Sequence, residues 1–156
     1  PLDIAGGDPA IGSRADGGHD LRVQERLDIA APLQRLDDIA QARLQGLDGC
    51  ARWDAVADVR SVQQGPIGFV GEYDSVFASA SAPLQLHDGT HRLDVAQSPT
   101  MGQTVVWNPG AALCARLADM PPEGHAHMLC VEAAQIDTPV HLAPGASWTG
   151  WQRLRA

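Results

Sequence analysis

The chain lacks lysine altogether and contains few residues of positive charge. All 11 of its basic residues are arginine, and the 19 acidic residues give a formal net charge of −8 over 156 residues. Nucleic acids and anionic membranes are bound by basic surfaces, so this balance argues against both as partners. It leaves room for a small anion held by a few local arginines.

Long apolar runs and paired cysteines are also missing. No run of 18 apolar residues could span a membrane, and the N-terminus lacks the charged start, apolar core and small-residue cleavage site of a signal peptide. Cys50, Cys114 and Cys130 are widely spaced and form no C-x-x-C or metal-finger pattern. We interpret them as small hydrophobic side chains in a reducing compartment, and we expect a cytoplasmic protein.

The composition is sufficient for one domain with a hydrophobic core, since 44% of the residues are hydrophobic. Residues 1–30 are rich in Gly, Ala, Asp and Pro, which predicts an irregular leader that is not necessarily native to the rest. Within it, Val23, Leu27 and Ile29 would also fit one or two weak strands or a short helix. Residues 31–156 form the predicted domain.

From residue 39 onward, short apolar stretches alternate with turn signals. Strands expected about every 10–15 residues are typical of an all-β sandwich. The clearest hairpin lies in residues 83–98, with Leu84 and Leu86 before a turn at Asp88-Gly89 and Leu93 and Val95 after it. Further strands are predicted at 103–107, before Asn108-Pro109-Gly110, and at 128–133, while residues 110–119 could form a short helix.

Glu132 stands at the end of an apolar run that reads as a buried strand. In an extended chain, Met128, Cys130 and Glu132 share one face. Because both faces of the run are apolar, we expect a central strand and a partly buried carboxylate, whose raised pKa would suit a general base. The alternatives are a glutamate facing an edge, or one paired with Arg43 or Arg116.

Several segments in fixed order resemble one enzyme family. They read DIAQARLQGLDG (38–49), GPIGFVGEYDSVF (65–77), VVWNPG (105–110), ADM (118–120), MLCVEAA (128–134) and VHLAPGASWTGWQRL (140–154). Together they are similar to the glucose-6-phosphate 1-epimerases, or hexose-6-phosphate mutarotases. The resemblance covers about residues 36–154 and corresponds to the C-terminal half of the family's domain.

The resemblance implies a partial galactose-mutarotase-like β-sandwich (a supersandwich) that interconverts the anomers of glucose 6-phosphate or another hexose 6-phosphate. Glu132 matches the family's catalytic base, and Asp74 matches its substrate-binding aspartate. Asp74 could instead cap a turn at a strand end. The reaction needs an acid and a base only, so we expect a sugar phosphate as the small-molecule partner, no cofactor and no metal.

One part of the family pattern is missing. The family's acid is the histidine of an H-x-Y-F segment, and its place here is taken by Ala31; the nearest upstream histidine is His19. We therefore expect a truncated and impaired epimerase. The alternatives are a non-catalytic carbohydrate-binding or scaffold remnant of the same fold, and a generic β-sandwich interaction module. Half of a sandwich would leave sheet surface uncovered, so self-association is possible.

The remaining histidines give weaker signals. His125 and His127 would share a face in an extended chain, which makes a two-histidine metal site conceivable, but no third ligand supports it. His87 and His91 flank a turn and should be exposed, and His141 is expected in a strand.

Overall fold

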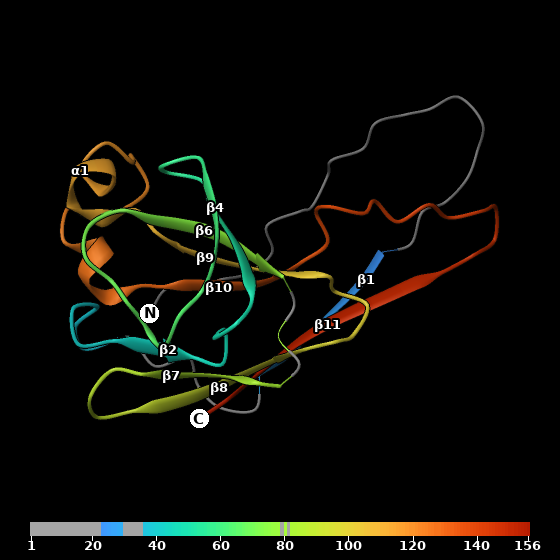
Figure 1. Cartoon of the computed structure of the whole chain (residues 1–156), viewed down its shortest axis with the longest axis horizontal. Coiled ribbons are helices and arrows are strands. Elements are labelled where there is room, and N and C mark those ends of the chain that lie inside the picture. The colour runs from blue at the N-terminus through green and yellow to red at the C-terminus, as the bar shows by residue number, and fades with distance from the viewer. Residues whose placement is uncertain (1–22, 30–35, 79, 81) are drawn as a thin grey trace.

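The computed structural model describes residues 23–29, 36–78, 80 and 82–156, and these form a β-sandwich of two sheets (Figure 1). The first sheet has six strands, in the order β1 (Val23–Ile29), β11 (Trp148–Arg155), β8 (Arg92–Gln97), β7 (Leu84–His87), β2 (Arg43–Gln45) and β5 (Ile67–Gly68).

The second sheet has five strands and lies over the first. Its order is β10 (Cys130–Ala134), β9 (Gln103–Asn108), β6 (Tyr73–Ala78), β3 (Ala51–Asp54) and β4 (Val59–Val62). Two short helices follow β9 in the chain, α1 (Gly110–Cys114) and the 3-10 helix η1 (Gly124–His127). No helix in the described residues is long and apolar enough to cross a membrane.

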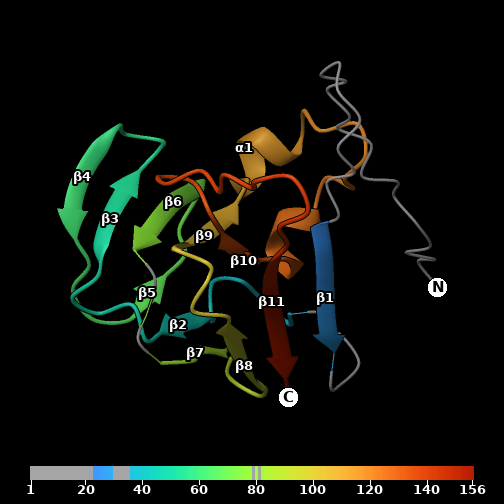
Figure 2. The same ribbon diagram turned by 90° about the vertical axis from the view of Figure 1, so that its right-hand side faces the viewer.

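Almost all described strand pairs are antiparallel, as expected for hairpins joined by short turns. The exception is β1, which lies beside β11 and runs parallel to it (Figure 2). Its register pairs Val23 with Trp148 and Ile29 with Leu154. Seven residues of the predicted leader are therefore a strand and not irregular, as the alternation of Val23, Leu27 and Ile29 allowed.

The core lies between the two sheets. Phe77 on β6 and Val106 on β9 are fully buried, and they face Leu44 and other apolar side chains of the first sheet. The burial pattern of β7 and β8 explains why this hairpin was predictable: Leu84, Leu86 and Val95 are buried, and their neighbours are more exposed.

The predicted all-β sandwich is confirmed. The strands predicted at 103–107 and 128–133 are present as Gln103–Asn108 and Cys130–Ala134, and the helix considered at 110–119 is the shorter Gly110–Cys114. Two further features differ from the predictions. The hairpin β3–β4 was missed because every residue of β4 is exposed, so no apolar alternation marks it. His141 lies outside any strand, in the exposed segment before β11. Most of the predicted leader, residues 1–22 and 30, lies outside the described residues.

Candidate functional site

The candidate base and the candidate sugar ligand lie on strands separated by a single strand. In the second sheet β9 pairs with β6 on one side and β10 on the other. The register places Trp107 opposite Asp74 and also opposite Cys130, and it places Val105 opposite Glu132. The strand that carries Trp107 therefore runs between the two candidate carboxylates.

The two carboxylates project from the same face of this sheet. Residues that lie opposite each other across antiparallel strands point to the same side, and residues two apart along a strand do so too. Asp74, Trp107, Cys130 and Glu132 consequently share one face, which we call the outer face. The opposite face carries the core residue Phe77 and its neighbours.

The prediction that Glu132 is partly buried is wrong. Glu132 is exposed. The apolar run before it was interpreted as a central strand, but β10 is the edge strand of its sheet within the described residues. A short run that is apolar on both faces can therefore come from an edge strand. On β10 the outward-facing side chain of Glu132 is exposed. Arg43, one proposed partner, donates instead to the carbonyl oxygens of Ala40 and Ala42.

Asp74 is half-buried, which distinguishes it from Glu132. Burial raises the pKa of its carboxyl above the usual range, and the nearby charges of Glu72 and Asp54 raise it further. Two strand spacings put about 10 Å between the backbones of β6 and β10, so Asp74 and Glu132 are separated by roughly that distance along the sheet.

Cys130 is the immediate neighbour of Glu132 on the outer face. Burial, the negative charge of Glu132 and a hydrogen bond to Glu132 together raise the pKa of the Cys130 thiol to about 11. All three cysteines are free thiols. The protonated thiol can thus donate a hydrogen bond to the candidate base and limit where its carboxylate points.

We predict that Cys130 reacts slowly with iodoacetamide at pH 8, because a pKa near 11 leaves about one thiol in a thousand ionised. Glu132→Gln removes the neighbouring charge, so labelling should accelerate by about tenfold for each unit by which the thiol pKa falls. Peptide mass spectrometry measures the rate at each cysteine. Labelling of Cys50, whose pKa is raised by burial and by Asp48, serves as the control. An unchanged Cys130 rate in Glu132→Gln would show that the two groups are not in contact.

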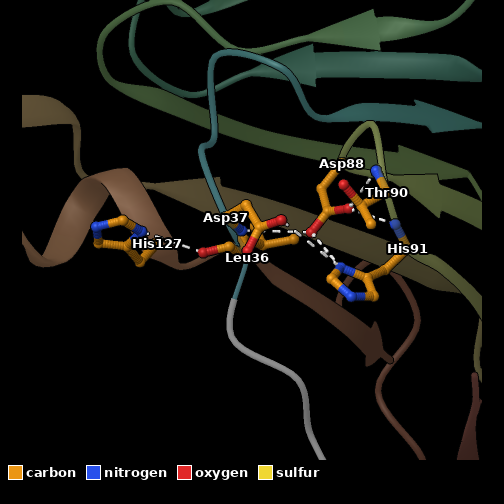
Figure 3. Close-up of polar contacts among 6 residues, drawn as sticks. All are labelled: Leu36, Asp37, Asp88, Thr90, His91 and His127. Atoms are coloured by element: carbon orange, nitrogen blue, oxygen red, sulfur yellow. Dashed lines mark hydrogen bonds and ion pairs between the residues drawn. The ribbon is translucent and has the colours of Figure 1, made fainter.

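A second group of polar side chains lies on the first sheet, at the turn between β7 and β8 (Figure 3). Asp88 is buried there, and Oδ1 accepts hydrogen bonds from the backbone N–H groups of His91 at 2.8 Å and Thr90 at 3.3 Å. Oδ2 accepts from the N–H of Asp37 at 3.3 Å and lies 3.4 Å from Nδ1 of His91.

Asp37, Asp88 and His91 bring possible metal-ligand atoms within 4.8 Å of one another. However, both carboxylate oxygens of Asp88 already accept hydrogen bonds from backbone N–H groups. These bonds account for the cluster, since Asp88 caps the turn between β7 and β8. The capped turn also ties the segment at Asp37 to the hairpin, and next to it Nδ1 of His127 lies 3.1 Å from the carbonyl oxygen of Leu36.

The cap predicts a dependence of stability on pH. Burial alone would raise the pKa of Asp88, but the hydrogen bonds from His91, Asp37 and Thr90 lower it overall. The ionised Asp88 therefore stabilises the fold fully at pH values above its ordinary pKa of about 4. This stabilisation is lost as the pH falls through the lower pKa that Asp88 has in the folded chain. Asp88→Asn should lower the free energy of unfolding at pH 7 by roughly 1.5–3 kcal/mol and flatten its decline in acid. Urea denaturation at several pH values measures this, with exposed Asp119→Asn as the control; equal acid profiles for both variants would contradict it.

The two-histidine metal site considered from the sequence is not supported. His125 and His127 lie in the 3-10 helix η1, so their side chains do not share a face as they would in a strand. Neither belongs to the group of potential ligands found among the described residues. His91 is exposed, as expected, and His87 is half-buried.

Comparison with solved structures defines the class of the fold. The chain is similar to the crystal structure of a "putative mutarotase (YeaD)" from Salmonella typhimurium, with a TM-score of 0.58 and 32% sequence identity, over 62% of this chain and 34% of that one. With two mostly antiparallel sheets around one core, the fold is a galactose-mutarotase-like β-sandwich, present in part.

Residues 35–155 match the family described as Aldose 1-epimerase, and the chain belongs to this family. Two relatives carry the name "Putative glucose-6-phosphate 1-epimerase". The protein of Cenchrus ciliaris is 31% identical over 124 residues, which are 78% of this chain and 38% of the relative. That of Salmonella typhimurium is 32% identical over 106 residues, 65% of this chain and 35% of the relative. The chain thus spans little more than a third of the length of these relatives.

Proposed function

We propose that the outer face around Asp74 and Glu132 is part of a hexose-6-phosphate 1-epimerase site. The observation that carries the proposal is the placement of both carboxylates on one face, on either side of the strand of Trp107. Sugar sites combine an aromatic or apolar surface with a few polar groups that fix orientation, and these residues offer that combination.

In the proposed reaction Glu132 takes the proton from the C1 hydroxyl of the sugar. With Ala31 in the place of the family's acid, the solvent supplies the proton that the ring oxygen takes as its bond to C1 breaks. The C1–C2 bond then rotates, and as the ring closes on the other face the ring oxygen gives its proton back to the solvent and Glu132 returns its proton to the C1 oxygen. Glu132 is open to solvent, so a sugar can reach it and displace its water. Asp74 accepts hydrogen bonds from sugar hydroxyl groups and holds the ring against the sheet.

A non-catalytic carbohydrate-binding role is the second candidate. Two observations favour it: Ala31 occupies the place of the family's acid histidine, and the carboxylate of Glu132 is exposed where a general base is usually desolvated. This role uses the same face and the same Asp74, so the two candidates differ in catalysis and not in where the sugar binds.

Calorimetric titration with glucose 6-phosphate tests the binding that both candidates share. We expect Asp74→Ala to weaken binding by roughly ten- to a hundredfold, because it removes hydrogen bonds to a charged acceptor. Asp119→Asn, an exposed aspartate outside the two sheets, should leave the affinity unchanged. Absence of binding by the unaltered chain, or equal affinity in Asp74→Ala, would contradict the proposal.

A further inference from the structure

Asn108 ends the strand that runs between the two candidate carboxylates. Its side chain is almost completely buried, at 1% exposure. It is the first residue of the Asn108-Pro109-Gly110 turn, and in the register it lies opposite Tyr73, the neighbour of Asp74.

The amide group of this side chain reaches the segment that leads into β10. Nδ2 donates hydrogen bonds to the carbonyl oxygens of His125 and Met128, both at 2.8 Å. These residues lie 17 and 20 positions further along the chain. Met128 lies two residues before Cys130, the first residue of β10, and β10 carries Glu132.

The other end of the amide holds Gly110, which packs against the segment that leads into β6. Oδ1 of Asn108 accepts a hydrogen bond from the N–H of Gly110 at 2.8 Å. Gly110 has φ +61, and a Cβ atom there would lie 2.4 Å from the backbone nitrogen of Glu72. The turn therefore packs directly against the backbone of Gly71 and Glu72, just before Asp74.

We propose that Asn108 is a positioning residue that fixes the strand of Asp74 and the strand of Glu132 relative to each other. One amide group bonds to the segment before β10 and to Gly110, which packs against the backbone of the segment before β6. It therefore sets how far apart the two carboxylates lie on the outer face. The importance of this spacing rests on the proposed function; the contacts themselves do not.

A turn cap alone would not need this residue. An Asx-type turn uses only the side-chain oxygen, which Ser or Asp could supply. The two Nδ2 bonds to distant carbonyl groups need an amide, because only an amide carries a donor and an acceptor in this shape. Asn108→Ser keeps an oxygen near Gly110 and removes both donors, so it separates the two roles.

Amide hydrogen exchange followed by NMR tests the proposal without substrate. In Asn108→Ser we expect exchange to accelerate by about ten- to a hundredfold in Cys130–Ala134 and at Tyr73 and Asp74, relative to β7 and β8. Ile67→Val is the matched control, because it weakens the core at the first sheet. It should accelerate amide exchange, but not more in β6 and β10 than in the other strands. Equal acceleration throughout Asn108→Ser would overturn the proposal.

The unaltered chain provides a second test that does not depend on a variant folding. The side-chain amide protons of Asn108 should exchange much more slowly than those of the exposed Gln64 and should show nuclear Overhauser contacts with residues 125–128. Rapid exchange would overturn the proposal. Glucose 6-phosphate should then bind more weakly to Asn108→Ser than to Ile67→Val. If the exchange results hold but the unaltered chain binds no sugar phosphate, the proposed function fails and the positioning role remains.

Discussion

Replacing Phe77 by alanine is expected to lower the free energy of unfolding by about 3–5 kcal/mol. Phe77 is fully buried between the two sheets, and its neighbours on paired strands are Arg52 and Thr104. Removing the ring leaves a cavity that the surrounding strands cannot close, since their backbones are fixed by hydrogen bonds on both sides. Such a loss is a large part of the stability of a typical domain, so the variant should unfold at a much lower urea concentration than the unaltered chain.

Urea denaturation followed by tryptophan fluorescence measures this effect. Val59→Ala is the control, because Val59 on β4 is 52% exposed and its truncation should change the free energy of unfolding by no more than about 0.5 kcal/mol. A small change in Phe77→Ala would mean that the two sheets do not share the core around Phe77.

The second large effect concerns catalysis. General acid catalysis by one positioned group contributes about 10²–10⁴-fold, and Ala31 stands where the family's acid is expected. We therefore expect this chain alone to interconvert the anomers of glucose 6-phosphate at the spontaneous rate. Polarimetry on the freshly dissolved α-anomer measures that rate.

The same assay with Glu132→Gln separates the two candidate functions. Equal rates for both forms would favour the carbohydrate-binding role. A clear acceleration that disappears in Glu132→Gln would contradict the prediction of inactivity, and it would identify Glu132 as the base. Asp119→Asn is the control for the effect of removing one exposed negative charge.

Some of the fold could be predicted because the relevant physics is local. The hairpin β7–β8 combines a two-residue period with Asp88-Gly89, and both features are visible in the sequence. The end of β9 was predicted for a similar reason, since Pro109 cannot continue a strand and Gly110 adopts positive φ.

The rest depends on contacts between distant segments. The parallel pairing of β1 with β11 joins residues more than a hundred positions apart, and no local pattern encodes it. Whether β10 is a central or an edge strand is likewise decided by its neighbours, which is why Glu132 was wrongly expected to be buried.

The candidate site was predicted in part. The resemblance identified Asp74 and Glu132, and the register places them on one face, while their roles stay predictions. Asn108 was interpreted only as a turn residue, because its bonds to His125 and Met128 cross a loop whose path the sequence does not reveal. The signal that such reasoning could look for is a polar side chain directly after an apolar strand and before Pro-Gly, as in Trp107-Asn108-Pro109-Gly110.

Mapping glucose 6-phosphate by NMR is the most direct test of the central claim, that the outer face of the second sheet binds a hexose phosphate. We expect the chemical shifts of Asp74, Trp107, Cys130 and Glu132 to change with one common affinity, while residues of β2, β7 and β8 stay unaffected. Shift changes confined to the first sheet, or no changes at saturating sugar phosphate, would contradict the claim.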